Sequence, residues 1–106
     1  MHVISAQEAK KRLDNQSILL IDIREPYERE ICHIAQSEHL PMGDVEAIKL
    51  KVQHSEKESV LICKSGKRAE ATANLIEKEL NIDNVFILDG GIIAWIETIE
   101  PHLELY

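Results

Sequence analysis

Cys63 lies in a short stretch whose residue types suit nucleophilic chemistry. The residues that follow it, Lys64-Ser65-Gly66-Lys67-Arg68, bring three cations next to this thiol in a chain whose formal net charge is −7. Neighbouring cations and a helix N-terminus both stabilise a cysteine thiolate, which is the nucleophilic form. Gly66 can adopt a positive φ, so N–H groups of the loop can turn toward the sulfur as an anion-binding nest. The stretch therefore predicts a thiolate in a cradle that accepts a persulfide or a small anionic donor.

The second cysteine, Cys32, has different neighbours. It lies beside His33 and between Ile31 and Ile34, and no basic loop follows it. Buried cysteines in such surroundings commonly act as small apolar side chains, so we expect Cys32 to be a structural thiol. It would act as a resolving cysteine only if the folded chain brought it close to Cys63.

Three charged residues, Asp22, Arg24 and Glu28, follow an apolar run at residues 18–23. Side chains of this kind at the end of a strand could contact a substrate. More often such a set orders its loop by ion pairing, and we favour that supporting role here.

Apolar runs alternate with helical patterns along the chain, and Cys63 ends one of these runs. The capping-box sequence Ser5-Ala6-Gln7-Glu8 predicts a helix over residues 6–14. Further helices are expected after Pro26, over residues 44–52, from Lys67 to near Asn81, and around Trp95, and strands at 18–23, 59–62 and 85–88. Alternating strands and helices predict an α/β fold with a mainly parallel sheet and helices on both faces. Ligands bind such sheets at the carboxyl ends of the strands, where Cys63 falls.

Composition limits the function classes. The chain has 106 residues, 44% apolar and 29% charged, which is typical of one soluble domain spanning 1–106. The negative charge argues against nucleic acid, and no apolar run approaches the roughly 20 residues needed to span a membrane. Residues 1–11 lack the apolar stretch of a signal peptide, so a cytoplasmic location is the default expectation. The cysteines and histidines are too scattered for a predicted metal site.

Four separated motifs resemble those of the rhodanese homology domain, in the usual order and over nearly the whole chain. Residues 20–28 resemble the family's first signature, Asp-x-Arg with an acidic residue four positions later, and His33-Ile34 resembles the next segment. Residues 60–68 resemble its Cys-x-x-Gly-x-Arg active loop, and residues 88–91 with Trp95 resemble the closing signature. Two departures are Cys32 and Gln36, which stand where the family usually has glycine.

The resemblance implies a parallel five-stranded sheet and a sulfurtransferase that uses no cofactor. Cys63 would take a sulfane sulfur from a small anionic donor such as thiosulfate and hold it as a persulfide. The loop from Lys64 to Arg68 would bind and orient the donor, and a thiol, cyanide or a sulfur-carrier protein would accept the sulfur. Residues 91–106, with Trp95, Pro101 and Tyr106, are similar to the end of rhodanese domains fused to E1-like adenylyltransferases, which supply sulfur to ubiquitin-like carriers.

Two alternatives remain beside sulfur transfer. Cysteine phosphatases use a similar thiolate cradle, but they typically have five residues between cysteine and arginine, whereas Cys63 and Arg68 are separated by four. The shorter loop makes a smaller cradle, which favours sulfur over a phosphate ester. The rhodanese fold also occurs as an inactive interaction module, usually with the cysteine replaced, and the presence of Cys63 argues against that reading.

Overall fold

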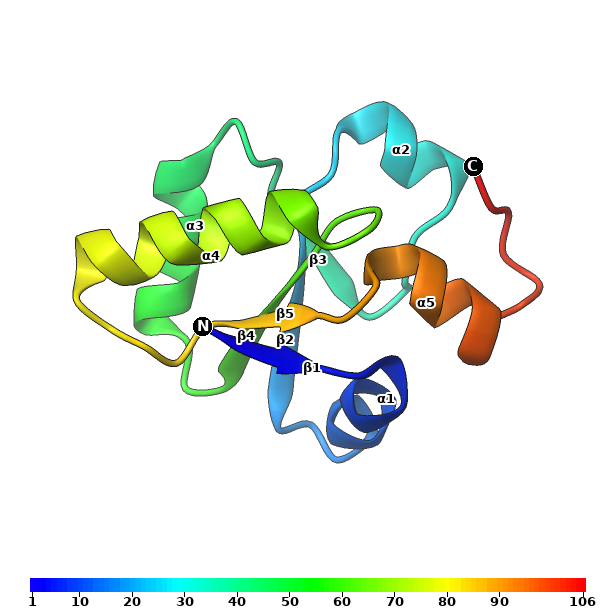
Figure 1. Ribbon diagram of the computed structural model, residues 1–106, viewed down its shortest axis with the longest axis horizontal. Helices are drawn as coiled ribbons and strands as arrows, with labels where there is room; N and C mark the ends of the chain where they lie inside the picture. The colour runs from blue at the N-terminus through cyan, green and yellow to red at the C-terminus, as the bar shows by residue number, and fades with distance from the viewer.

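The computed structural model describes all 106 residues as alternating strands and helices around one sheet (Figure 1). In chain order the elements are β1 (His2–Ile4), α1 (Ala6–Asp14), β2 (Ile18–Asp22), α2 (Pro26–Ile31), β3 (Ser37–His39), α3 (Val45–His54), β4 (Glu58–Ile62), α4 (Lys67–Leu80), β5 (Phe86–Leu88) and α5 (Gly91–Thr98).

The sheet has five strands in the order β1-β5-β4-β2-β3, and every pair of neighbouring strands is parallel. The predicted α/β fold with a five-stranded parallel sheet is therefore confirmed. All strands end at the same edge of a parallel sheet, so the loops after β2, β4 and β5 meet there. The candidate site lies in these loops.

Helices cover both faces of the sheet, and each face has its own apolar core. Side chains alternate between the faces along each strand, so Leu20 and Val60 join the core beneath α1 and α5. Their neighbours Ile21 and Leu61 join the core beneath α3 and α4. Figure 1 shows α1 and α5 on one side of the strands and α3 and α4 on the other.

Local signals explain several element boundaries. The N–H of Glu8 donates to Ser5 Oγ over 3.1 Å, and α1 spans the residues that the capping sequence predicts. Helix α4 begins directly after Gly66 and ends before Asn81, which adopts a left-handed conformation. Because a left-handed residue cannot continue a right-handed helix, the amphipathic pattern stops where it was predicted to stop.

Candidate active site

The alternation of side chains along β4 points Cys63 toward α4. Leu61 and Cys63 belong to the core on the α4 side of the sheet, whereas Val60 and Ile62 belong to the opposite core. The chain then turns through the loop and enters α4. The thiol therefore faces the N-terminus of the longest helix in the molecule.

Two backbone N–H groups donate to the sulfur of Cys63. Gly66 N lies 3.0 Å from Cys63 Sγ, and Ala69 N lies 3.3 Å from it. Hydrogen bonds to an anionic acceptor are about twice as strong as neutral ones, so this arrangement stabilises a thiolate. Donation by Gly66 falls within the predicted loop, while donation by Ala69 comes from the first turn of α4, just beyond it.

Other amides of the loop have no acceptor within the protein. The N–H groups of Ser65, Lys67 and Arg68 make no hydrogen bond to a backbone or side-chain acceptor. The first N–H groups of a helix lack intrahelical partners and favour anions. These donors are available to an anion, or to a second sulfur atom attached to Cys63.

Gly66 has the backbone conformation that the loop requires. Its φ of +112° lies in the left-handed region, where residues with a Cβ are strained. A Cβ at this position would have open space, since its nearest contact would be 3.9 Å away at Leu88 O. Glycine is therefore favoured here because it can adopt a positive φ, as the sequence predicted, and not because space is short.

The backbone of Cys63 is also held from the opposite side by the start of α5. Ile92 N donates to Cys63 O over 2.9 Å, and Ile93 N donates to Lys64 O over 3.3 Å. This approach is possible because residue 91 is glycine: a Cβ there would stand 2.3 Å from Lys64 O and 2.6 Å from Cys63 O. As a result, Cys63 is only 1% exposed, and a reacting group must enter the loop to reach its sulfur.

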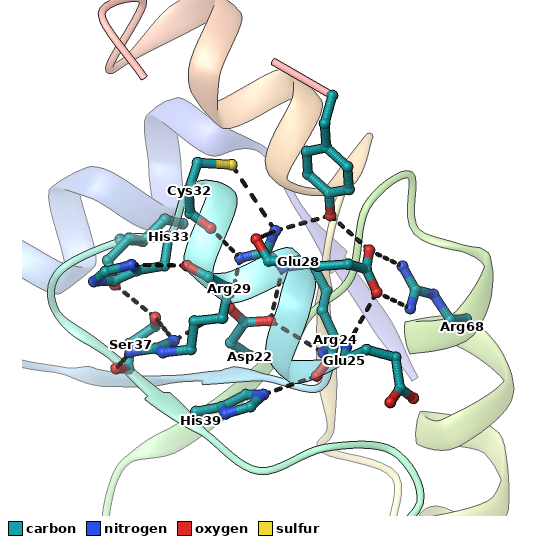
Figure 2. Close-up of polar contacts among 12 residues, drawn as sticks. Asp22, Arg24, Glu25, Glu28, Arg29, Cys32, His33, Ser37, His39 and Arg68 are labelled. Carbon is teal, nitrogen blue, oxygen red and sulfur yellow. Dashed lines mark hydrogen bonds and ion pairs between the residues drawn. The ribbon is translucent and has the colours of Figure 1, made fainter. Parts of the chain in front are cut away.

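Arg68 is held by Glu28, a residue of α2 (Figure 2). Arg68 Nη1 and Nη2 lie 2.6 and 2.7 Å from the two carboxylate oxygens of Glu28. These hydrogen bonds lower the pKa of Glu28 to about 2 although its burial opposes the shift, and they raise the pKa of Arg68. Both terminal nitrogens of its guanidinium thus connect α4 to α2, and the predicted role of Arg68 in orienting a donor stays a prediction.

Asp22 and Arg24 form a second ion pair at the end of β2. Arg24 Nε and Nη2 donate to the two Asp22 carboxylate oxygens over 2.9 and 2.8 Å. Arg24 also donates to the carbonyl oxygens of Glu28 and Cys32. Burial lowers the pKa of Arg24, but the bonds to Asp22 and Tyr106 outweigh it, so the net shift is upward. This pair orders α2, and Figure 2 shows both side chains in contact with neighbouring residues.

Tyr106 connects the two ion pairs and also contacts the loop. Its hydroxyl donates to Glu28 Oε2 over 2.6 Å and accepts from Arg24 Nη1 over 2.8 Å. Burial and the bond to Glu28 raise its pKa to about 12, so the hydroxyl keeps its proton at neutral pH. The ammonium of Lys64 lies 4.5 Å from the centre of the Tyr106 ring. No pattern in the sequence predicted a site role for Tyr106.

The remaining predicted residues of the loop lie at its surface. Ser65 and Lys67 are exposed, and together with Gly66 they border a hollow of about 210 Å³ that extends to Asp89 and Gly90. Lys67 forms no ion pair. Lys67 and the half-buried Lys64 are thus the two loop cations that no carboxylate neutralises.

Cys32 lies on the other face of the sheet from Cys63. It belongs to the core beneath α1 and α5, and its sulfur is 3.9 Å from Arg24 Nη1. Both cysteines are free thiols, and their separate cores show that Cys32 does not contact the sulfur of Cys63. A role as resolving cysteine therefore gains no support from the geometry.

No group of three or more histidine, cysteine or acidic side chains is arranged to hold a metal ion. No helix combines the length and the apolar character needed to cross a membrane.

The strand-end thiol, the amide cradle and the five-stranded parallel sheet can be compared with known proteins. The sequence profile of the rhodanese-like domain family matches residues 5–98. This chain belongs to the rhodanese-like domain family. The resemblance of its motifs to that family is thereby confirmed.

Relatives of this rhodanese-like domain include larger proteins named for sulfur transfer. It is 32% identical over 106 residues to the probable adenylyltransferase/sulfurtransferase MoeZ of Mycobacterium tuberculosis, covering 97% of this chain and 26% of MoeZ. It is 25% identical over 109 residues to the adenylyltransferase and sulfurtransferase MOCS3 of Drosophila persimilis, covering 97% of this chain and 24% of MOCS3. The chain thus spans about a quarter of the length of these relatives.

A solved structure supports the same fold. A rhodanese-related protein from Thermoplasma volcanium matches with a TM-score of 0.79 and 28% sequence identity. The match covers 95% of this chain and 96% of that protein, so a chain of similar length forms the same fold.

Proposed function

We propose that this rhodanese-like domain is a sulfurtransferase that carries sulfur as a persulfide on Cys63. The observation that carries the proposal is the loop geometry: two N–H groups bond to Cys63 Sγ, and three more from the same loop have no acceptor. The first two stabilise the thiolate, and the others are suited to the outer sulfur or to a departing anion. The names of MoeZ and MOCS3 support the same class of reaction.

The proposed reaction has two displacement steps. The Cys63 thiolate attacks the outer sulfur of a donor such as thiosulfate, forming a new S–S bond, and sulfite leaves with the electron pair of the broken S–S bond. An acceptor thiolate or cyanide then attacks the outer sulfur of the persulfide, and Cys63 leaves again as a thiolate. Sulfur, charge and electrons balance over the two steps, and neither step requires a metal or cofactor.

The small donor fits the enclosed position of the thiol. Because Cys63 is 1% exposed, a slim sulfur group can reach it more readily than a bulky ester. Lys64 and Lys67 supply positive charge for the approach of an anion.

The engaged state of Arg68 argues against the phosphatase alternative. A phosphatase of this kind needs its arginine free to hold the phosphate oxygens, whereas both terminal nitrogens of Arg68 bond to Glu28. Steady-state turnover tests the choice directly. Formation of thiocyanate from thiosulfate and cyanide should greatly exceed hydrolysis of an aryl phosphate, and the reverse ranking would overturn the proposal.

A sulfur-carrier protein is the proposed physiological acceptor. The support is the similarity of residues 91–106 to rhodanese domains fused to adenylyltransferases, together with the matches to MoeZ and MOCS3. The test uses domain charged with labelled sulfur and candidate carrier proteins. Transfer of label to a carrier supports the proposal, whereas transfer to small thiols alone, with no carrier labelled, would contradict it.

A further inference from the structure

Tyr106 contacts the candidate site at two points although it lies far from the loop in sequence. Its hydroxyl bridges Arg24 and Glu28, which are 82 and 78 positions away. Its ring lies under the ammonium of Lys64, the residue directly after Cys63. Figure 1 shows the C-terminal segment leaving α5 and reaching the region of α2, which brings Tyr106 to these partners.

The ring contact places a positive charge beside the loop. A lysine side chain is flexible, and a cation above an aromatic face is held there by the negative potential of the ring. The half-buried Tyr106 ring is itself fixed in place, because its hydroxyl bonds to Arg24 and Glu28, which are both buried. The ring thus limits where the Lys64 ammonium can lie.

The three cations of the loop differ in how strongly their charge is neutralised or screened. Arg68 is neutralised by its ion pair with Glu28. Lys67 is exposed to solvent, where its charge is strongly screened. Two loop cations, Lys64 and Lys67, have no carboxylate partner, and Lys64 is the less screened of the two because it is half-buried. The position of its ammonium therefore affects how strongly the loop attracts an anion.

We propose that Tyr106 is a positioning residue of the site: its ring holds the Lys64 ammonium beside the loop, which gives Cys63 its preference for anionic reaction partners. The inference deepens the proposed sulfur-transfer function. It concerns the electrostatic environment of the thiol, however, so it can be tested without any sulfur transfer.

The test compares the alkylation of Cys63 by iodoacetate, an anion, and by iodoacetamide, its neutral analogue. The same thiolate attacks the CH2 carbon of either reagent and displaces iodide, so the ratio of the two rate constants reports the charge near the sulfur and cancels changes in thiolate reactivity or folding. All variants carry Cys32→Ser, so that Cys63 is the only thiol. Tyr27→Leu is the matched control, because Tyr27 is 65% exposed and forms no hydrogen bond or cation–π contact with the loop.

Tyr106→Leu should lower the iodoacetate-to-iodoacetamide ratio by about twofold to fivefold, the size of an exposed cation–π interaction. Tyr106→Phe keeps the ring and should lower the ratio less, while Tyr27→Leu should leave it unchanged. Lys64→Ala should lower the ratio as well, and adding Tyr106→Leu to Lys64→Ala should produce no further decrease.

Three results would overturn the inference: an unchanged ratio in Tyr106→Leu, an equal decrease in Tyr106→Phe and Tyr106→Leu, or a full further decrease when Tyr106→Leu is added to Lys64→Ala. A failure of persulfide formation with the expected ratios would instead count against the proposed function alone. The two hypotheses are therefore separable.

Discussion

The two cysteines of this domain are both buried, yet their surroundings differ in kind. The sulfur of Cys63 accepts hydrogen bonds from two backbone N–H groups at the start of α4. The sulfur of Cys32 lies near a guanidinium that already bonds to Asp22, Tyr106 and two carbonyl groups. Backbone N–H groups that have no acceptor in the protein can bind a reacting anion. A guanidinium whose N–H groups already have acceptors stabilises the fold. Burial alone therefore does not distinguish a reactive thiol from a structural one.

The first prediction concerns the approach of α5 to the backbone of Cys63. Gly91→Ala should destabilise the protein by roughly 3–4 kcal/mol, because the new Cβ would overlap the carbonyl oxygens of Lys64 and Cys63. Urea unfolding measures the change. Gly43→Ala is the matched control, since a Cβ there meets nothing within 4 Å, and its effect should stay within about 0.5 kcal/mol. Equal effects of the two changes would show that the close approach does not hold the loop.

The second prediction concerns the ion pair that ties the loop to α2. Glu28→Gln should cost about 2 kcal/mol at pH 7, because Glu28 is buried while Arg68 is partly exposed. The control is Glu46→Gln, which removes an exposed pair with Lys49 and should cost about 0.5 kcal/mol or less. Chemical denaturation of both variants measures the difference.

The same pair predicts a pH dependence with a defined sign. The folded-state pKa of Glu28 is about 2, below its ordinary value of 4.5, so the folded state favours the carboxylate. The stabilisation is therefore complete above about pH 5 and is lost as the pH falls through 4.5 toward 2. The stability difference between the original protein and Glu28→Gln should shrink over this range. A difference that stays constant from pH 7 to pH 2.5 would contradict the assigned pair.

The third prediction tests the turn that aims the amides at Cys63. Gly66→Ala should cost about 1–2 kcal/mol, because a residue with a Cβ is strained at positive φ although the site has room for it. Relief of that strain moves the amide of residue 66, so persulfide formation should also slow. Full stability together with unchanged persulfide formation would show that the conformation of Gly66 is not required.

The smallest expected effect is that of Cys32→Ser. A buried hydroxyl in place of a thiol should cost about 1 kcal/mol, and the extent of sulfur uptake should not change. Thermal unfolding and sulfur uptake measured on the same preparation check both statements. Loss of sulfur uptake without unfolding would show that Cys32 takes part in the reaction. It would contradict the contrast drawn between Cys32 and Cys63.

Local patterns made much of the fold predictable. The Ser5 cap and the apolar period of residues 67–80 set the limits of α1 and α4, because these signals lie within the elements themselves. Strands β1 and β3 could not be located from residue patterns, since each has three residues and lies at an edge of the sheet. β3 in particular consists of Ser37, Glu38 and His39, which show no apolar pattern.

The site was predictable where it is local and not where it depends on distant contacts. The position of Cys63 at a strand end and the positive φ of Gly66 follow from adjacent residues. The bond between Glu28 and Arg68 spans 40 positions, and that between Glu28 and Tyr106 spans 78. No pattern in a single sequence identifies such partners, because only the fold brings them together. The catalytic and binding roles of Cys63 and its loop stay predictions until they are tested.

Intact-mass measurement after exposure to thiosulfate tests the central claim most directly. The original protein and Cys32→Ser should each gain one sulfur atom that a reducing thiol removes, whereas Cys63→Ser should gain none. A sulfur gain that persists in Cys63→Ser and disappears in Cys32→Ser would contradict the assignment of the persulfide to Cys63.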